Sequence, residues 1–479
     1  MINLVKNELI KIFSKKAIYV YTAIVLSLMF GISFLSRNFS ISENGTYTPE
    51  FIENMKDKLD TYDLEDEYGL DMYIGDRVII DVYDLSKNYN SNSPEKYYVD
   101  TYIQPLILEK YTYEFRRKDL EQAKVLQLQI DELVKKLNNF NWKLLISEEK
   151  TQLENDIKEL EGLLLLDKDN NDLKNSLEEL KINLWCLNYR LANDIPYSYS
   201  SKSQLIDDYL NYYVQYQSAV KDESLIKNRN ELITNREIVE NYHVSLYKLE
   251  NDMLETDSFM LELITGTFAY VDTLIICAIV IIIGSIVSEE FNKGTIKQLL
   301  IKPFSRGKIL TSKIIAGFIA VMVFVLIYEV GYLIINCYEY NDFTSIFGTN
   351  VIYDFNLGKA REVSVLGQCL YGFITVMPAY LIIFLIVLFV GVISTNSVAA
   401  IAAGFGAFLG GDLIALTLKP QIIAWMPFFT WDMSPYMYGG ISSNQYATFT
   451  NSLIVNVVTI LVLLVLSFIV FKRKDIKNQ

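Results

Sequence analysis

The sequence predicts an all-α polytopic membrane protein with six transmembrane helices and a mainly helical, coiled-coil-containing extracellular domain between the first two of them. Two observations carry this prediction. Six long stretches are apolar, and one long acidic segment separates the first of them from the other five. The whole-chain averages hide this pattern, because a net charge of −14 is typical of a soluble acidic protein, whereas a mean hydropathy of +0.21 is typical of a membrane protein.

A helix that crosses the bilayer needs about 20 apolar residues, because the hydrocarbon core is about 30 Å thick. Six stretches meet this requirement: 17–35, 268–287, 314–335, 371–394, 398–418 and 453–471. The first follows Lys11, Lys15 and Lys16, as a secretory signal would. Its apolar run is longer than the usual 7–15 residues or so, and no A-x-A-like cleavage site follows, so we expect a retained span.

Positive charge indicates the orientation of these spans. If the N-terminus is cytoplasmic, the inner segments hold 14 Lys and Arg residues and the two short outer loops hold 3. Cytoplasmic loops are enriched in these residues. Both termini are therefore predicted to be cytoplasmic, with residues 1–35 forming an amphipathic helix and the first span, and residues 268–479 forming the other five spans.

The remaining segment, residues 36–267, is predicted to be an extracellular domain. It carries 26 Lys and Arg against 45 Asp and Glu, a net charge of −19, so the rest of the chain carries +5. Leucine repeats at 3 and 4 residue spacing lie on both sides of the polar run 167–172, which favours an antiparallel helical hairpin. A similar repeat over 239–253 predicts a helix leading to the second span, and 77–85 is the best strand candidate.

Two features of this domain have alternative interpretations. Its many tyrosines fit either a surface that binds a peptide or wall polymer, or ordinary packing. The acidic run over 63–71 fits either a Ca²⁺ site or a solvated face, and it lacks the spacing of an EF-hand loop.

The composition and the motifs exclude several classes. The chain is 51% hydrophobic, too apolar for a disordered protein, and it is too acidic to bind nucleic acid by bulk charge. Four scattered cysteines make no disulfide framework. No P-loop and no nucleophile elbow occur, and the single histidine, His243, has no metal-ligand spacing around it. We therefore expect no catalytic residue, no metal and no cofactor on this chain.

The inner loop after the second span carries the most informative motif. Residues 289–302 suit a short amphipathic helix at the membrane surface, and Pro303 ends it before Ser305-Arg306-Gly307 turns the chain back. Such a helix is a natural docking surface for another protein. The candidate docking residues are Glu289, Glu290, Gly294, Thr295, Leu299, Leu300, Pro303 and Arg306.

This loop, the six stretches and the amphipathic start Met1–Lys11 resemble the ABC-2 family of transport permeases. The resemblance implies a multi-pass permease of the bacterial cell membrane, working as a homodimer or as a heterodimer with a related permease. It also implies that the loop contacts a separate ATPase subunit, present in two copies, which binds ATP and Mg. The cargo would be peptides of antimicrobial or bacteriocin type, lipids or drugs. The long insertion after the first span departs from simple members of that family.

A second resemblance leaves an alternative open. One span, a long outer region rich in coiled coil and five further spans are similar to the phage-infection-protein type. In that case the chain would be an envelope receptor or scaffold without an ATPase. For an exporter, the acidic outer domain could attract a cationic peptide before or after export.

Polar and aromatic residues within the apolar part are further candidates. Asp272, Glu329 and Asp412 lie inside apolar stretches, where a charge costs at least ~2.5 kcal/mol near the bilayer centre. Asp272 and Asp412 lie near the predicted outer ends and are expected to reach water, whereas Glu329 either lines a path or pairs between helices. Residues 422–440 resemble a re-entrant segment that closes the pathway, with Trp425, Phe428, Phe429 and Trp431 at the membrane interface.

Overall fold

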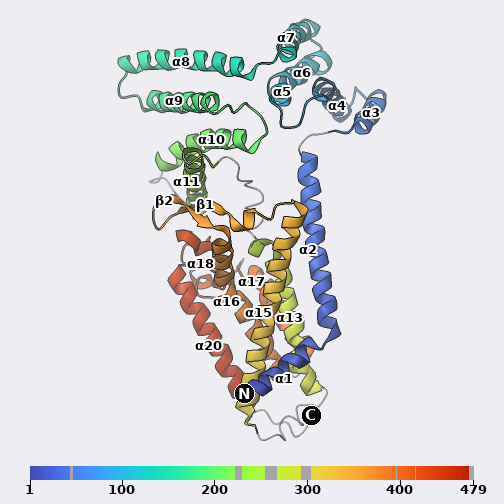
Figure 1. Ribbon diagram of the computed structural model, residues 1–479, viewed down its shortest axis with the longest axis vertical. Helices are drawn as coiled ribbons and strands as arrows, with labels where there is room; N and C mark the ends of the chain where they lie inside the picture. Colours follow the sequence, from blue (N-terminus) through green and yellow to red (C-terminus); the bar gives the residue numbers. More distant parts are fainter. Residues whose placement is uncertain are drawn as a thin grey trace. The chain divides into compact units, whose positions relative to one another are not determined.

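The computed structural model describes residues 1–43, 47–221, 229–253, 267–292, 304–394, 396–415 and 417–473. Helices predominate among them, as the sequence predicts; they are labelled in Figure 1. The chain divides into two compact units. The apolar unit comprises Met1–Arg37, Leu225–Glu240 and Asp257–Gln479, and the polar unit comprises Asn38–Ser224 and Asn241–Thr256.

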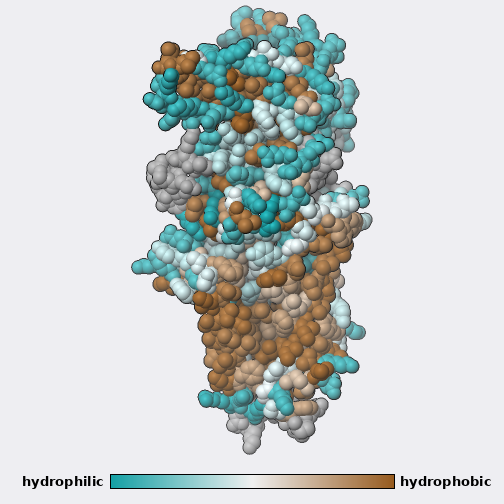
Figure 2. Space-filling view, turned by 60° about the vertical axis from the view of Figure 1, so that its left-hand side comes forward, coloured by the Kyte–Doolittle hydropathy of each residue, from teal (hydrophilic) through white to brown (hydrophobic). Residues whose placement is uncertain are grey.

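The apolar unit is built from long helices around one core. They are α1 (Ile2–Phe13), α2 (Lys16–Glu43), α13 (Thr267–Asn292), α15 (Arg306–Glu339), α16 (Val365–Ser394), α17 (Ser397–Ala415) and α20 (Phe449–Arg473). Val25, Ile279, Val325 and Ile383 belong to this core and come from four different helices. Hydrophobic side chains also cover the outer surface of the unit, as the brown band in Figure 2 shows. An apolar surface of this extent is typical of helices that face lipid.

Four helices are long and apolar enough to cross a membrane: α2, α15, α16 and α20. Asp272–Gly284 in α13 and Ser397–Gly411 in α17 are shorter apolar segments over the described residues. Each of these four helices and two shorter segments falls on one of the six apolar stretches in the sequence. The membrane character of the chain is thus supported, and the count of six spans stays a prediction.

Helix α1 is the amphipathic N-terminal helix that the sequence predicts. Leu4, Glu8 and Ile12 are buried at a spacing of four residues, whereas Ile2 and Ile10 are exposed. This face of α1 packs against α15. Ser14 and Lys15 then separate α1 from α2.

A β-hairpin that the sequence analysis missed follows α15 and the short helix η5 (Ser345–Phe347). Strand β1 (Thr349–Asp354) pairs antiparallel with β2 (Lys359–Ser364). Gly358 in the turn has φ +64°, a conformation that glycine adopts without steric cost. Arg361 donates two hydrogen bonds to Oδ2 of Asp354, at 3.0 and 2.9 Å, and so holds the ends of the turn together.

Three short helical segments connect α17 to α20. They are α18 (Pro420–Ile423), α19 (Pro427–Thr430) and the 3₁₀ segment η6 (Ser434–Gly439). A proline at the first or second position starts each of them, because its fixed φ suits a helix start and its missing N–H is not needed there. α19 packs against α20.

The polar unit is helical over its described residues. It contains α3 (Pro49–Lys58), η1 (Leu59–Thr61), α4 (Glu67–Ser86), α5 (Pro94–Tyr98), the π-helical turn η2 (Val99–Ile103), α6 (Gln104–Tyr111), a second π-helical turn η3 (Thr112–Arg116), α7 (Leu120–Asn138), α8 (Trp142–Leu166), α9 (Asn171–Ala192) and α10 (Ser201–Lys221). Helix α11 (Arg229–Glu250) belongs to the apolar unit up to Glu240 and to the polar unit from Asn241 onwards.

The strand predicted over 77–85 is wrong, because these residues lie within helix α4. Asp66 caps the helix, its carboxylate accepting a hydrogen bond from the backbone N–H of Gly69 at 2.9 Å. Ile74, Val78 and Val82 then recur every four residues and enter one core with α6 and α7. Packing along this helical stripe outweighs the strand preference of the β-branched run.

The predicted helical hairpin is present. α8 and α9 pack against each other, and Ile146, Leu153, Ile157 and Leu187 form their shared core. The Asn170 side chain caps α9 by accepting hydrogen bonds from the backbone N–H groups of Asp172 and Leu173, both at 3.1 Å. Helix α11 covers most of the helix predicted over 239–253, and its extension toward the second span lies outside the described residues.

The core of the α8–α9 hairpin can be tested with matched substitutions. Ile146 is 0% exposed and Leu165, on the same helix, is 73% exposed. Ile146→Ala should lower the free energy of local opening of α8 and α9 by about 2–5 kcal/mol, because it removes buried methyl groups and leaves a cavity. Leu165→Ala should change it by less than about 0.5 kcal/mol. Hydrogen exchange of the full chain measures both, and equal effects would contradict this packing.

Candidate functional site

Three polar side chains from three helices meet inside the apolar unit. They are Asp272 of α13, Glu329 of α15 and Tyr380 of α16, and we call them the carboxyl cluster. Glu329 is 5% exposed and Tyr380 is 0% exposed. Each of the three interacts electrostatically with at least one of the others. Residues far apart in the chain thus form one buried polar group.

The carboxyl cluster has unsatisfied hydrogen-bonding groups. Both carboxyl oxygens of Glu329, Oδ1 of Asp272 and the Tyr380 hydroxyl have no hydrogen-bond partner among the described residues. The Tyr380 hydroxyl approaches Asp272 without reaching full hydrogen-bond geometry. Buried polar groups are usually hydrogen-bonded, since an unsatisfied one costs about 1–3 kcal/mol. An arrangement that is costly for folding is a candidate for function.

The sequence predicted part of this cluster. It indicated Glu329, which the structure places in the cluster. Asp272 was expected to reach water; the residue is partly exposed, and its Oδ1 is buried. Tyr380, two residues after Pro378, was not predicted, because a tyrosine in an apolar stretch carries no signal of its own. Asp412 lies in α17, and its side chain is outside the described part of the structure.

A buried ion pair links the N-terminal helix to the start of α15. Lys313 Nζ lies 3.0 Å from Glu8 Oε2, and both side chains are almost completely buried. Lys11, half exposed, contacts the other carboxylate oxygen of Glu8 at 2.9 Å. A buried charge is costly unless a counter-charge lies beside it. Glu8 and Lys313 therefore stay paired, and the pair holds α1 and α15 in one arrangement.

Of the predicted docking residues, the structure places Arg306 in full. It is the first residue of α15, and its NH1 donates a hydrogen bond to the backbone carbonyl of Lys472 in α20 at 3.1 Å. Glu289 and Glu290 lie in the last turns of α13, with undescribed side chains. Gly294, Thr295, Leu299, Leu300 and Pro303 lie outside the described residues. The start of α15 is therefore tied to both α1 and α20.

The four aromatic residues predicted at the interface do not form one cluster. Trp425 is exposed between α18 and α19. Phe428 and Trp431 contact each other edge to face, with ring centroids 5.6 Å apart, and Trp431 also packs on the core of the unit. Phe429 is half-buried. Asn456 Nδ2 of α20 donates to the Thr430 carbonyl at 2.8 Å, which anchors this segment to the last helix.

The first half of α11 makes contacts that the sequence did not reveal. Arg236 NH1 donates to the Gly439 carbonyl at 2.9 Å, and its guanidinium lies 4.6 Å from the ring centroid of Phe355. Arg229 Nε donates to the Ser442 carbonyl at 3.0 Å. Phe355 also donates its backbone N–H to the Tyr438 carbonyl. The start of α11, the β-hairpin and η6 are thus joined within the apolar unit.

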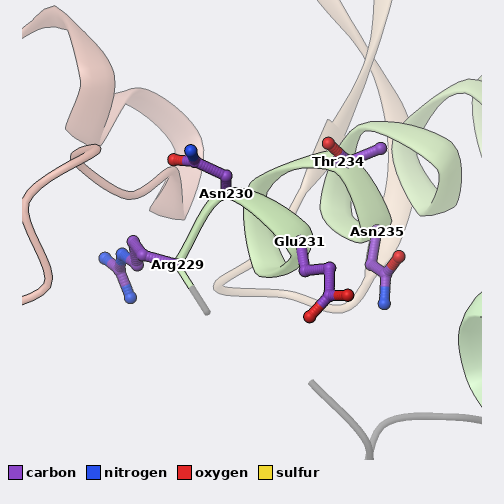
Figure 3. A pocket seen from close by; sticks show the side chains of 5 residues that line it. All are labelled: Arg229, Asn230, Glu231, Thr234 and Asn235. Carbon is purple, nitrogen blue, oxygen red and sulfur yellow. The ribbon is translucent and has the colours of Figure 1, made fainter. Parts of the chain in front are cut away.

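A cavity of about 560 Å³ lies at this start of α11. Arg229, Asn230, Glu231, Thr234 and Asn235 line it. Figure 3 shows that Glu231 and Asn235 point to the same side of the helix. Among the described residues, the lining side chains are polar and come from one helix. Within the described residues, no group of three His, Cys, Asp or Glu side chains is arranged to hold a metal ion there or elsewhere.

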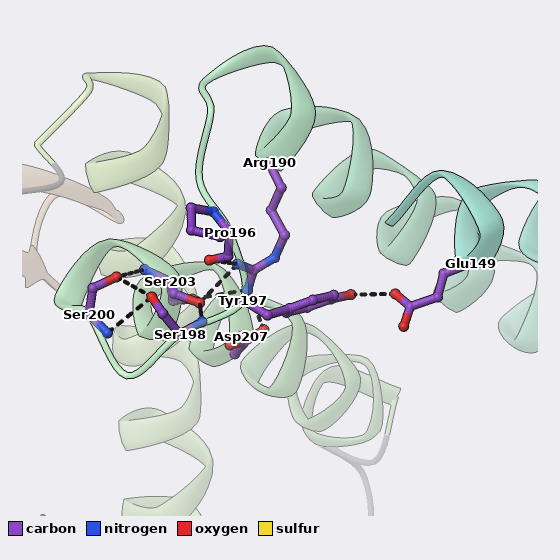
Figure 4. Close-up of polar contacts among 8 residues, drawn as sticks. All are labelled: Glu149, Arg190, Pro196, Tyr197, Ser198, Ser200, Ser203 and Asp207. Carbon is purple, nitrogen blue, oxygen red and sulfur yellow. Dashed lines mark hydrogen bonds and ion pairs between the residues drawn. The ribbon is translucent and has the colours of Figure 1, made fainter. Parts of the chain in front are cut away.

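The polar unit contains a buried arginine with a full set of partners (Figure 4). Arg190 donates to the Pro196 carbonyl, to Oγ and the carbonyl of Ser203, and to Oδ1 of Asp207, which is 2.6 Å away. Its guanidinium lies 4.4 Å from the ring centroid of Tyr197. Burial raises the pKa of Asp207, and Arg190 opposes this by favouring the charged carboxylate. This network joins α9 to α10 and has a structural role.

The fold and these sites define a mostly helical protein with apolar helices of membrane-spanning length and a large polar unit inserted after the first of them. The chain belongs to the family DUF2705, a protein family of unknown function, whose profile matches residues 231–477. It is 28% identical over 239 residues to the uncharacterized protein YhcI of Bacillus subtilis (strain 168), covering 47% of this chain and 68% of that protein. No solved structure matches.

The Glu8–Lys313 pair makes a testable prediction about stability. Lys313→Met should destabilise the apolar unit by about 3–5 kcal/mol, because it removes the buried counter-charge of Glu8 and leaves only the half-exposed Lys11 beside that carboxylate. The double variant Glu8→Leu, Lys313→Met should recover most of that loss. Lys11→Ala, which removes the exposed partner of the same Glu8, should cost less than about 1 kcal/mol. Thermal unfolding in detergent measures all three, and a double variant as unstable as Lys313→Met would refute the pairing.

Proposed function

We propose that this chain is the transmembrane permease subunit of an ATP-driven exporter of ABC-2 type. The observation that carries the proposal is the joining of α1 and α20 to the start of α15, the helix that directly follows the loop between α13 and α15 in the sequence. That loop contains the motif predicted to dock an ATPase. Helix α1, the start of α15 and the end of α20 are held together at this point. They form a unit that can receive force from a partner protein.

In this proposal the membrane part has six spans and both termini are cytoplasmic. The four helices of spanning length supply four of the spans, and the helices that contain Asp272–Gly284 and Ser397–Gly411 supply the other two. Six spans enclose too little space for a wide pathway. We therefore expect two permease subunits, identical or related, and two ATPase subunits that bind ATP and Mg.

In this proposal, the contacts described above couple ATP hydrolysis to the movement of the spans. When the ATPase subunits close, the loop between α13 and α15 is pushed. The Glu8–Lys313 pair and the Arg306–Lys472 hydrogen bond make α1 and α20 move together with α15. Because a buried ion pair resists separation, the motion reaches α15 as a rigid-body shift and not as a local bend.

The carboxyl cluster is then expected to lie on the export pathway. Its groups that have no hydrogen-bond partner among the described residues come from α13, α15 and α16, and α15 is the helix that would move. Ionisable groups inside spans commonly mark transport pathways. Peptides, lipids and drugs are the candidate cargo, moved outward.

The first test is whether an ATPase associates with the chain. The full chain should co-purify with the ATPase encoded beside it, and the double variant Leu299→Asp, Leu300→Asp should lose that association by roughly tenfold or more, as burying a charge in an interface does. Phe347→Asp is the matched control, since Phe347 is exposed in η5 beyond the other end of α15. Failure of the unaltered chain to bind any ATPase would reject the proposal and favour a receptor or scaffold.

The second test concerns Glu329. In cells that express the permease with its ATPase, Glu329→Gln should lower export by roughly tenfold, which corresponds to a barrier increase of about 1.4 kcal/mol. Glu339→Gln is the control, because Glu339 is a similarly buried glutamate on the same helix outside the carboxyl cluster. Survival against a panel of antimicrobial peptides, at equal amounts of protein in the membrane, is the measurement. Full survival with Glu329→Gln would exclude a role of the carboxyl cluster.

A further inference from the structure

A second cavity, of about 450 Å³, lies within the polar unit between the α5–η2 segment, the end of α7 and the start of α8. Ligand pockets commonly have volumes of about 300–1,000 Å³. Leu133 of α7, and Leu144 and Leu145 of α8, form an aliphatic part of its lining. The cavity is therefore large enough for one long side chain and has an apolar wall for it.

Aromatic rings form the remaining wall. The ring centroids of Tyr98 and Tyr102 are 5.1 Å apart, and those of Tyr98 and Phe140 are 4.9 Å apart. The hydroxyl of Tyr102 donates to Oε1 of Glu149 at 2.6 Å, while Tyr197 donates to the other oxygen of that carboxylate at 2.9 Å. This second set of contacts holds the ring of Tyr102 in place, so the wall is formed before any ligand binds.

Two carboxylates also line the cavity. Glu132 and Glu148 are exposed side chains on α7 and α8, and neither forms an ion pair within the part of the chain that the structure describes. The pKa of Tyr98 is raised, first by burial and then by Glu148 and Glu132. Lys135 and Lys136 also line the cavity.

We propose that this cavity binds a lysine or arginine side chain of an amphipathic peptide. Aromatic faces attract a cation through the ring quadrupole, and flanking carboxylates add a direct charge interaction. The aliphatic wall takes the methylene stem of such a side chain or a neighbouring apolar residue. The net charge of −19 on residues 36–267 favours the approach of a cationic ligand over that of an anionic one.

This inference goes beyond the proposed transport function and does not depend on it. A peptide site on the polar unit serves a receptor as well as an exporter. The experiment below contains no ATPase, so its failure and the failure of the exporter proposal are separate results.

The experiment uses the full chain in nanodiscs of neutral phosphatidylcholine and a short fluorescent peptide of alternating lysine and leucine. The same peptide with glutamate in place of lysine is the ligand control, and empty nanodiscs measure adsorption to lipid. We expect saturable binding of the lysine peptide that weakens as ionic strength rises. We expect binding of the glutamate peptide to be weaker by roughly tenfold or more.

Charge-matched variants locate the site. Glu132→Lys with Glu148→Lys should weaken binding of the lysine peptide by roughly tenfold or more. Glu121→Lys with Glu159→Lys makes the same change in net charge at two exposed positions of α7 and α8 outside the cavity, and it should change the affinity by less than about twofold. All four positions are exposed, so both double variants should fold. Equal weakening by the two variants, or no binding by the unaltered chain, would overturn the proposal.

Discussion

The cost of removing charged and hydrogen-bonding groups from water governs the arrangement of both units. In an apolar environment each backbone N–H and C=O must find a partner within the chain, and helices provide one without leaving the segment. The apolar unit accordingly consists of long helices, and its β-hairpin and 3₁₀ segment lie in the connections between them. The same cost determines which charged side chains the interior can hold.

Charges are buried in three different ways in this protein. Arg190 in the polar unit is surrounded by acceptors, so its burial stabilises the junction of α9 and α10. Lys313 and Glu8 neutralise each other and fasten α1 to α15. Glu329 has neither a hydrogen-bond partner nor a counter-charge among the described residues. Because the first two sites are explained by stability and the third is not, the carboxyl cluster is the part of the apolar unit where a function best accounts for the structure.

The tyrosines of the polar unit lie in two kinds of surroundings. Much of the tyrosine in the polar unit is ordinary packing, as in the stacked pair Tyr209 and Tyr242. Tyr98 and Tyr102 differ, because they pack on one side and line a cavity flanked by carboxylates on the other. The sequence left packing and peptide binding as alternatives for these tyrosines. The structure shows that the tyrosines lie in different surroundings, since burial depends on neighbours that the order of residues does not reveal.

The sequence by itself determined the helical class, the separation of apolar from acidic segments, the α8–α9 hairpin and the choice of Glu329 as a candidate, because hydropathy, charge and heptad spacing are properties of residues in order. It was wrong about 77–85, where β-branched residues suit a strand but their four-residue spacing packs as a helix. Only the tertiary structure decided that Glu8 meets Lys313, 305 positions away, and that Asp272 and Tyr380 join Glu329. Which buried charge has a partner depends on how helices pack, and packing unites residues that no local pattern connects.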